Sequence, residues 1–427
     1  MSARKLLIVA YHFPPLAGSS GIQRALRLVQ QLPDFGWQPL VLSADPRAFE
    51  RTSQDQLQDI PAGTVVERAF ALDAARHLAL GGRYFAWTAR PDRWISWRFD
   101  AVRRGMKLIR KYRPDAIWST YPIATAHLIA AELQRRSGLP WLADFRDPML
   151  QEGYPADPVT WRQFKRIEEQ TFAHASRTVF TTPGAARYYT ARYPGLQDRM
   201  RVVENGYDEE SFAAAEATLP AVRAPLRSQG MTLLHSGVVY PYERDPTQLM
   251  AALRLLLDRG SLWPGRLCIR FRASGHDGLI RALAERHGVS QFIELLPPMG
   301  YRDALSEMLC ADALLVMQAA NCNDQVPAKV YEYLRSHRPV LALTDPAGDT
   351  ARVLSSSGIQ AIAPLDDSAA IAALLDEVMA GRRSDMLATA PAIRAASRKG
   401  RTAALVAELD TLTRRQAGNG MPAAGET

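Results

Sequence analysis

Cysteine is scarce in this sequence, and long hydrophobic runs are missing from it. Only Cys268, Cys310 and Cys322 occur among 427 residues, without the spacing of a thiolate metal site. This excludes a disulfide framework and favours a reducing compartment. No window approaches the ~20 apolar residues that a membrane-spanning helix requires, and the apolar run near the N-terminus is too short for a signal-peptide core. We therefore expect a cytoplasmic protein.

Three common ligand-binding signatures are also missing. The chain has no G-x-G-x-x-G, which argues against a dinucleotide-binding dehydrogenase, and no Gly-Lys-Ser/Thr that would complete a P-loop. It has no obvious Asp-x-Asp metal site. We therefore expect neither a bound metal nor a cofactor.

The bulk composition describes a large globular chain. Apolar residues make up 47% and charged residues 22%, and a length of 427 residues predicts two domains. The net charge of +8 favours anionic partners, namely sugar nucleotides, anionic lipid or nucleic acid. Charge alone does not choose among these partners.

Short apolar runs alternate with amphipathic stretches along most of the chain. The amphipathic stretches fit helices; in residues 22–32, for example, apolar side chains recur at helical spacing. Such alternation predicts parallel sheets with helices on both faces. Two series predict an α/β protein with two Rossmann-like, doubly wound domains facing a central cleft. The expected strands are KLLIVAY, PLVLSA, DAIWST, PWLADF and RTVFTT in the first half, and MTLLHSG, LCIRFRASG, QFIELLP, ADALLVMQ and RPVLALT in the second.

The weakest segment between the two series is rich in alanine and broken by Pro220 and Pro225, so the domain boundary is expected there. A helical pattern near the C-terminus follows the last expected strand, and it either caps the second domain or returns to the first. The expected parts are a domain over 1–212, a linker over 213–230, a domain over 231–390, a helix over 391–415 and a disordered tail over 416–427.

A loop of small residues separates the first expected strand from the first expected helix. It consists of Gly18, Ser19, Ser20 and Gly21, and Arg24 follows in the helix. Uncovered backbone N–H groups at a helix N-terminus favour an anion. The stretch predicts a phosphate-binding loop; the alternative is a flexible turn before a capped helix.

Two cations and two acids in the second half can bind a phosphorylated sugar. Arg244 precedes a helix and can hold a phosphate oxygen in bidentate fashion, or it can pair with a neighbouring acid. The segment 320–343 carries Asp324, Lys329 and Glu332 on one loop-and-helix unit. Carboxylates accept hydrogen bonds from vicinal hydroxyls, and a lysine between them can contact a phosphate. The alternative is a surface helix whose Glu332 pairs with a basic neighbour such as Arg335.

Four residues at strand ends of the first half are candidates for an acceptor site. Asp144 and Arg146 lie in ADFRDPM, where the acid could orient an acceptor hydroxyl and the arginine could pair with an anionic acceptor. His12 follows the first expected strand, and Tyr121 follows DAIWST. The alternative reading is structural pairing within the loops and packing of the two rings.

The segment 90–115 is basic and aromatic. It has nine Lys or Arg against three acids, and it carries Trp94, Trp97 and Phe99. This combination is typical of contact with an anionic membrane surface, and it could also suit single-stranded nucleic acid. The alternative is that the aromatic rings cover a core and that a solvated basic helix follows them. A nucleic-acid binder would leave 320–343 unexplained, so no nucleic-acid partner is expected.

The segment PAKVYEYLRSHRPVLA resembles the donor-binding segment of retaining glycosyltransferases of the GT-B fold, in the bacterial branch of the family-four group. KLLIVAYHFPPLAGSSGIQRALRLVQQLPDFGWQPLVLSA is similar to the family's N-terminal acceptor-side segment. LPWLADFRDPM and VVENGYD resemble two further phrases of the family, and all four stand in the family's order. The resemblance covers roughly residues 4–390.

This resemblance implies a metal-independent hexosyltransferase that moves a sugar from a nucleotide donor to an acceptor with retention at the anomeric carbon. It assigns the nucleotide ribose to Glu332, the transferred sugar to Asp324, and the diphosphate to Arg244 and Lys329. The family often has glutamate at the position of Asp324, and an arginine where Val238 stands here. The further donor-side residues expected are Gly237, Pro298 and Met299.

The acceptor is expected to be a glycan or a lipid-linked glycan, in the synthesis of a cell-surface polysaccharide or glycolipid. A lipid-linked acceptor would place the protein peripherally at the inner membrane face. Two alternatives remain open: a nucleotide-sugar 2-epimerase of similar architecture, and a protein that binds a nucleotide sugar or glycan without turning it over.

Overall fold

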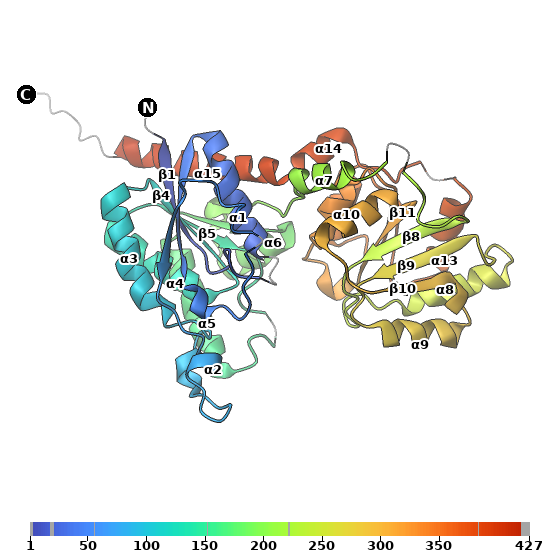
Figure 1. The fold of residues 1–427 in the computed structure, drawn as a ribbon, viewed down its shortest axis with the longest axis horizontal. Helices are drawn as coiled ribbons and strands as arrows, with labels where there is room; N and C mark the ends of the chain where they lie inside the picture. Colours follow the sequence, from blue (N-terminus) through green and yellow to red (C-terminus); the bar gives the residue numbers. More distant parts are fainter. Residues whose placement is uncertain are drawn as a thin grey trace, which may run out of the picture. The chain divides into compact units, whose positions relative to one another are not determined.

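The computed structural model describes residues 3–17, 21–54, 56–151, 153–220, 223–382 and 384–419, the last range with side chains to residue 414 (Figure 1). The chain divides into two compact units. The N-terminal unit consists of Met1–Glu204 with Arg401–Thr427, and the C-terminal unit consists of Asn205–Gly400. Each unit contains one parallel sheet with helices on both faces, which confirms the predicted fold class.

The N-terminal unit is built on seven strands in the order β3-β2-β1-β4-β5-β6-β7. The interior strand β1 is paired in parallel with β2 and β4, with Ile8 opposite Val41 and Trp118. Its last four residues are fully buried because helices cover both faces. The strands are β1 (Arg4–Val9), β2 (Trp37–Ala44), β3 (Val65–Ala69), β4 (Ala116–Thr120), β5 (Trp141–Phe145), β6 (Arg177–Phe180) and β7 (Met200–Val202).

The helices of this unit follow the predicted alternation. In α1 the buried residues include Ile22, Ala25, Leu26 and Val29, the face that the sequence predicts. The helices are α1 (Gly21–Gln31), α2 (Ala74–His77), α3 (Trp97–Tyr112), α4 (Ala124–Ser137), α5 (Pro158–His174), α6 (Pro183–Arg192) and α15 (Arg398–Asn419).

The C-terminal unit is built on six strands in the order β10-β9-β8-β11-β12-β13. Alternate side chains of β11 enter two different cores: Leu315 and Met317 pack with α8, α9 and α13, whereas Leu314 and Val316 pack with α7, α10 and α11. The strands are β8 (Met231–Ser236), β9 (Leu267–Arg272), β10 (Ile293–Leu296), β11 (Ala313–Gln318), β12 (Val340–Thr344) and β13 (Ile362–Ala363). The helices are α7 (Glu209–Glu216), α8 (Thr247–Asp258), α9 (Asp277–His287), α10 (Tyr301–Cys310), α11 (Lys329–Arg335), α12 (Asp349–Ser356), α13 (Ser368–Met379) and α14 (Ala390–Ala395).

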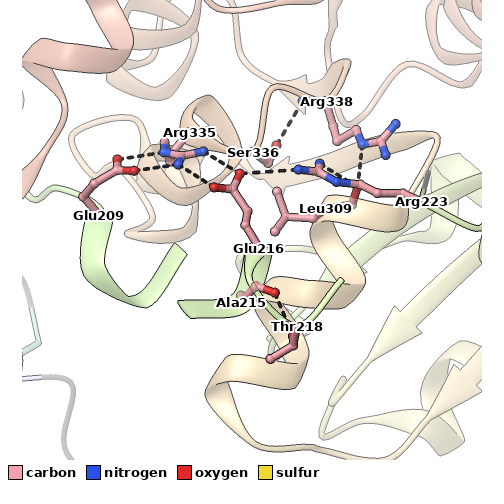
Figure 2. Close-up of polar contacts among 9 residues, drawn as sticks. All are labelled: Glu209, Ala215, Glu216, Thr218, Arg223, Leu309, Arg335, Ser336 and Arg338. Carbon is pink, nitrogen blue, oxygen red and sulfur yellow. Dashed lines mark hydrogen bonds and ion pairs between the residues drawn. The ribbon is translucent and has the colours of Figure 1, made fainter. Parts of the chain in front are cut away.

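The units divide after Glu204, whereas the sequence placed the boundary at 213–230. The difference arises because α7, which overlaps the predicted linker, packs into the C-terminal unit. Figure 2 shows Arg335 of α11 between the carboxylates of Glu209 and Glu216, with four N···O distances from 2.6 to 3.1 Å. Such charge-assisted bidentate pairs fix geometry as well as adding energy. They tie the helix that carries Lys329 and Glu332 to the segment that enters this unit.

The C-terminal helix α15 packs on the N-terminal unit from Arg401 onward. Asp410 accepts a hydrogen bond from Trp37 Nε1 at 2.9 Å, and Glu408 pairs with Arg177 at 2.9 Å. The helix runs to Asn419, so the predicted disordered tail over 416–427 begins too early. Residues 420–427 lie outside the described part of the chain.

Candidate functional site

Lys329 is the first residue of α11 and lies beside the end of β8. Its Nζ lies 3.1 Å from His235 Nε2 on that strand. Gly237 follows the strand with φ +111°, a conformation that disfavours side chains, and a Cβ there would lie 3.2 Å from Nζ. The glycine therefore leaves the ammonium group accessible from the loop after β8. Both residues were predicted for this site.

His235 is fully buried and fixes the hydrogen-bond direction at Lys329. Its Nδ1 lies 3.0 Å from the Leu315 carbonyl oxygen. A carbonyl can only accept, so Nδ1 carries the proton and Nε2 accepts from Lys329. Burial, and then the nearby Lys329, hold the pKa of His235 well below its ordinary value. The imidazole is therefore neutral and serves as an acceptor.

The ammonium group of Lys329 has a pKa below its ordinary value. Burial, and then repulsion from Arg244, lower the pKa of its ammonium group to about 7, while Glu332 opposes the shift. A pKa near 7 means that the unliganded site holds its proton weakly. A bound anion would restore the full charge, which is the behaviour expected of a phosphate-binding lysine.

Arg244 lies in the loop between β8 and α8. Its guanidinium stands 5.2 Å above the Tyr240 ring and donates to the Val238 carbonyl at 3.3 Å. Glu243 lies 3.6 Å away, so part of the predicted pairing with a neighbouring acid is present. The buried Nε has no hydrogen-bond partner among the described residues. Two cations thus gather beside Gly237.

Glu332 lies one turn after Lys329 on α11. Tyr301, at the start of α10, donates its hydroxyl to Glu332 Oε1 at 2.8 Å. Burial raises the pKa of Glu332, while Tyr301, Arg398 and Lys329 act in the opposite direction. The suggested pairing of Glu332 with Arg335 is wrong, because Arg335 pairs with Glu209 and Glu216.

Three further predicted residues lie on loops of the same unit. Pro298 and Met299 lie in the loop between β10 and α10, shortly before Tyr301, and Met299 is exposed. This loop is held by Arg272, which donates to the Pro297 carbonyl at 2.8 Å. Asp324 lies exposed in the loop between β11 and α11. Its role toward the transferred sugar stays a prediction.

The N-terminal unit brings Arg24 and Asp144 together. Arg24 of α1 makes two hydrogen bonds to the carboxylate of Asp144 on β5, at 2.6 and 3.0 Å, and a third to the Val203 carbonyl at 3.1 Å. Asp144 is fully buried. The carboxylate of Asp144 therefore supports Arg24. The structural alternative expected pairing within the loop, whereas this pair joins α1 to the sheet.

His12, Gly21 and Arg146 are packed against one another. A Cβ added at Gly21 would lie 2.3 Å from His12 Nδ1 and 2.4 Å from Arg146 Nη1, so only glycine fits at the start of α1. Burial, and then Arg146, lower the pKa of His12 to about 4, so the imidazole is neutral near pH 7. The other three predicted loop residues, Gly18, Ser19 and Ser20, lie outside the described residues.

Tyr121 is a core residue in this structure. It is 3% exposed, and its ring packs edge-on against Phe164 at 6.5 Å. Burial, and then Tyr154, raise the pKa of its hydroxyl. These surroundings agree with the alternative that the Tyr121 ring serves packing. Its role in an acceptor site stays a prediction.

The sequence analysis missed three residues of the C-terminal cluster: His235, Tyr301 and Arg398. His235 lies near the end of a buried strand, where a histidine is a recognisable exception, but its partner is 94 residues away in sequence. Tyr301 lies two residues after the predicted Met299. Arg398 donates to the Gly206 carbonyl at 3.1 Å and lies beyond the segment that the motifs cover.

The described residues contain no group of three or more His, Cys, Asp or Glu side chains that could hold a metal ion. Metal independence of the reaction stays a prediction. Within the same residues, no helix combines the length and the apolar character that crossing a membrane requires.

Comparison with known sequences gives two findings. Residues 20–206 match a family model described as a glycosyl transferase 4-like domain. A D-inositol 3-phosphate glycosyltransferase from Streptosporangium roseum is 27% identical over 154 residues, so the chain spans only 35% of that relative.

Solved structures show the same architecture. α,α-Trehalose 6-phosphate synthase from Burkholderia multivorans matches with a TM-score of 0.61 at 14% identity, over 100% of both chains. HepE from Anabaena, solved with UDP, matches with a TM-score of 0.57 at 12% identity, over 97% of this chain and 99% of that chain. At these identities the likeness shows the fold, and it confirms the predicted GT-B architecture.

Proposed function

We propose that this chain, which carries a glycosyl transferase 4-like domain on a GT-B fold, transfers a sugar from a nucleotide sugar to an acceptor. The observation that carries the proposal is the convergence of Lys329, Arg244 and Glu332 around Gly237 in the C-terminal unit. Structural neighbours solved with UDP and UDP-glucose support a nucleotide-sugar donor.

The chemistry of transfer asks for stabilisation of charge. As the bond from the sugar to the diphosphate breaks, negative charge builds on the leaving phosphate, and fixed cations lower the barrier. Lys329 and Arg244 would supply these cations, with His235 orienting the ammonium group of Lys329. Glu332 would accept hydrogen bonds from the ribose hydroxyls, and Asp324 would contact the transferred sugar. We propose retention at the anomeric carbon and independence of divalent metal.

The acceptor side is assigned to the N-terminal unit. Arg146 and His12, packed against Gly21, would contact the acceptor, with Arg24 held in place by Asp144. A glycan or lipid-linked glycan is the proposed acceptor, in the synthesis of cell-surface polysaccharide or glycolipid. The lipid-linked case places the protein in the cytoplasm with a peripheral contact at the inner membrane face.

The pH dependence of donor binding tests the role of Lys329. Because the bound diphosphate requires a charged lysine, affinity should be nearly constant below pH 6 and fall by up to about tenfold per pH unit above pH 7. Calorimetry between pH 6 and 9 measures this, using the best-bound of UDP-glucose, GDP-mannose and ADP-glucose. A diphosphate esterified at both ends does not itself titrate in this range.

Lys329→Arg is the matched control, because a guanidinium stays charged throughout and should remove the pH dependence. The stability of the unliganded protein should change with pH in the opposite direction to donor affinity. The unfolded chain holds this proton more tightly, so stability should rise as the pH rises above 7. Equal donor affinity at pH 6 and 8.5, without proton uptake, would contradict the assignment.

Product analysis tests the proposed activity. The chain should release nucleotide from the bound donor only when an acceptor is present, with EDTA causing no loss, and NMR of the product should show the donor's anomeric configuration. Conversion of the donor sugar without acceptor would favour the epimerase. Undiminished donor affinity without transfer to any acceptor would favour a binding protein.

A further inference from the structure

Exposed apolar side chains are concentrated in one stretch of the N-terminal unit. Seven of the sixteen large hydrophobic side chains that are exposed among the described residues lie between residues 70 and 99. Leu80 is 86% exposed, Phe85 71%, Trp87 73% and Phe99 77%. Scattered exposed apolar residues are ordinary, but such a cluster marks an interaction surface.

The location differs from the one that the sequence suggested. Trp97 is fully buried, and Trp94 packs on Tyr11 with ring centroids 4.7 Å apart, so these two rings of the predicted segment 90–115 serve the core. Of the three aromatic residues named there, Phe99 alone is exposed among the described residues. The exposed cluster lies mainly upstream, in the loop between α2 and α3.

This loop is closed at its base. The Leu72 amide donates to Ser96 Oγ at 2.9 Å, and the Ala74 amide donates to the Arg93 carbonyl at 2.9 Å. From this base the loop that follows α2 extends beyond the rest of its unit (Figure 1). All residues from 80 to 87 are exposed.

The tip of the loop is a tight turn with an aromatic pair behind it. Gly81 and Gly82 have φ of +56° and +78°, and Leu80 and Arg83 exchange backbone hydrogen bonds of 2.8 and 3.1 Å. Two positive φ values are typical of a type I′ hairpin turn. Phe85 and Trp87 stack with centroids 6.3 Å apart. The apolar side chains thus stand on an ordered, convex element.

The acids and arginines of the loop are distributed unevenly, and one of its arginines, Arg90, pairs with Asp157 at 3.0 Å. Between Asp73 and Asp92 the chain contains Arg76, Arg83 and Arg90 and no acid. Both acids at the ends are engaged at the base: Asp73 pairs with Arg93, and Asp92 accepts hydrogen bonds from Thr125 and Trp94. The tip therefore presents leucine and aromatic rings together with an arginine.

The neighbouring face of α3 continues this character. An open groove of about 450 Å³ is lined by arginines and by apolar side chains. Its acid, Glu132, is neutralised by Arg135 and Arg136. The lining residues are Arg98, Phe99, Val102, Arg103, Met106, Arg110, Glu132 and Arg136.

We propose that the loop of residues 78–90, with the Phe99 end of α3, docks on an anionic lipid surface. Aromatic and leucine side chains on a convex tip can enter the interfacial layer, where Trp and Tyr are favoured, while arginines meet the lipid phosphates. This inference deepens the peripheral contact of the proposed function by naming its surface. It concerns binding only, so it can fail while sugar transfer holds.

Flotation with lipid vesicles tests the inference. At low salt, the full chain should float with vesicles of phosphatidylcholine and phosphatidylglycerol, and not with phosphatidylcholine alone. The double variant F85D/W87D should lose flotation, and Arg83→Glu should weaken it by about tenfold or more. Trp263→Asp is the matched control, since Trp263 is 52% exposed in the C-terminal unit and should leave flotation unchanged.

Two outcomes overturn the inference. The first is absence of flotation by the wild type, or equal flotation of F85D/W87D. The second is a self-associated species that F85D/W87D disperses without any lipid binding, which would assign the surface to a second copy of the chain. Stabilisation by nucleotide, measured in parallel, should be equal in all variants, so that loss of lipid binding and loss of the donor site are told apart.

Discussion

Lys329→Ala should abolish sugar transfer while the protein stays folded. The ammonium group is the best-defined cation of the donor site, and removing one preorganised group that stabilises transition-state charge costs about 10²–10³-fold in rate. Folding should not suffer, because burial already lowers the pKa of this lysine to about 7. The measurement is kcat for transfer, together with the midpoint of thermal unfolding.

A surface lysine provides the control for this variant. Lys165 on α5 makes an exposed pair with Glu169 at 3.8 Å, and its Nζ lies 5.8 Å from the centroid of the Trp161 ring. Both contacts are weak at an exposed site, so Lys165→Ala should keep wild-type turnover and stability. If Lys329→Ala retains near-wild-type turnover, the phosphate assignment is wrong. If Lys329→Ala unfolds, its contact with His235 matters for the fold, and Lys329→Met then separates packing from charge.

Glu332→Ala should have the second-largest effect, and it should act on the donor. Hydrogen bonds to a charged group contribute about 1.5–3 kcal/mol each, so loss of the two ribose contacts should lower kcat/KM by about 10²-fold or more. Tyr301→Phe is the milder companion, because it removes only the hydrogen bond that orients Oε1. We expect it to weaken donor binding by several-fold.

A donor that lacks a ribose hydroxyl completes the test. A 2′-deoxy nucleotide sugar should be a poor donor for the wild type, and Glu332→Ala should not distinguish it from the normal donor. The interaction free energy in this cycle assigns the contact to Glu332. If both proteins discriminate against the deoxy donor equally, Glu332 does not bind the ribose.

Much of the fold was predictable because the buried strands are continuous apolar runs. The three strands missed, β3, β7 and β13, lie at sheet edges, and β7 and β13 have only three and two residues. Edge strands are half-covered and short, so their periodicity is weak. The boundary was misplaced because α7 is alanine-rich, and its attachment depends on Arg335, more than a hundred residues away in sequence.

The candidate site likewise contains residues that local sequence spacing predicted and residues that only the fold brings together. Lys329 and Glu332 share one short helix, so their spacing alone suggested a joint role. His235 and Tyr301 reach them only through the fold, at sequence separations of 94 and 31 residues. The same holds for Arg24 and Asp144, where the sequence offered two separate candidates and the structure joins them through two hydrogen bonds. Local spacing predicts a site, whereas partners across a sheet require the fold.

Binding of nucleotides to the wild type and to Lys329→Ala tests the central claim most directly. We predict that one of UDP, GDP or ADP stabilises the wild type against thermal unfolding, by roughly 2.7 kcal/mol at 100 times its dissociation constant. The same nucleotide should stabilise Lys329→Ala far less. Equal stabilisation of the two proteins, or none of the wild type by any of the three, would contradict a diphosphate site built on Lys329, Arg244 and Glu332.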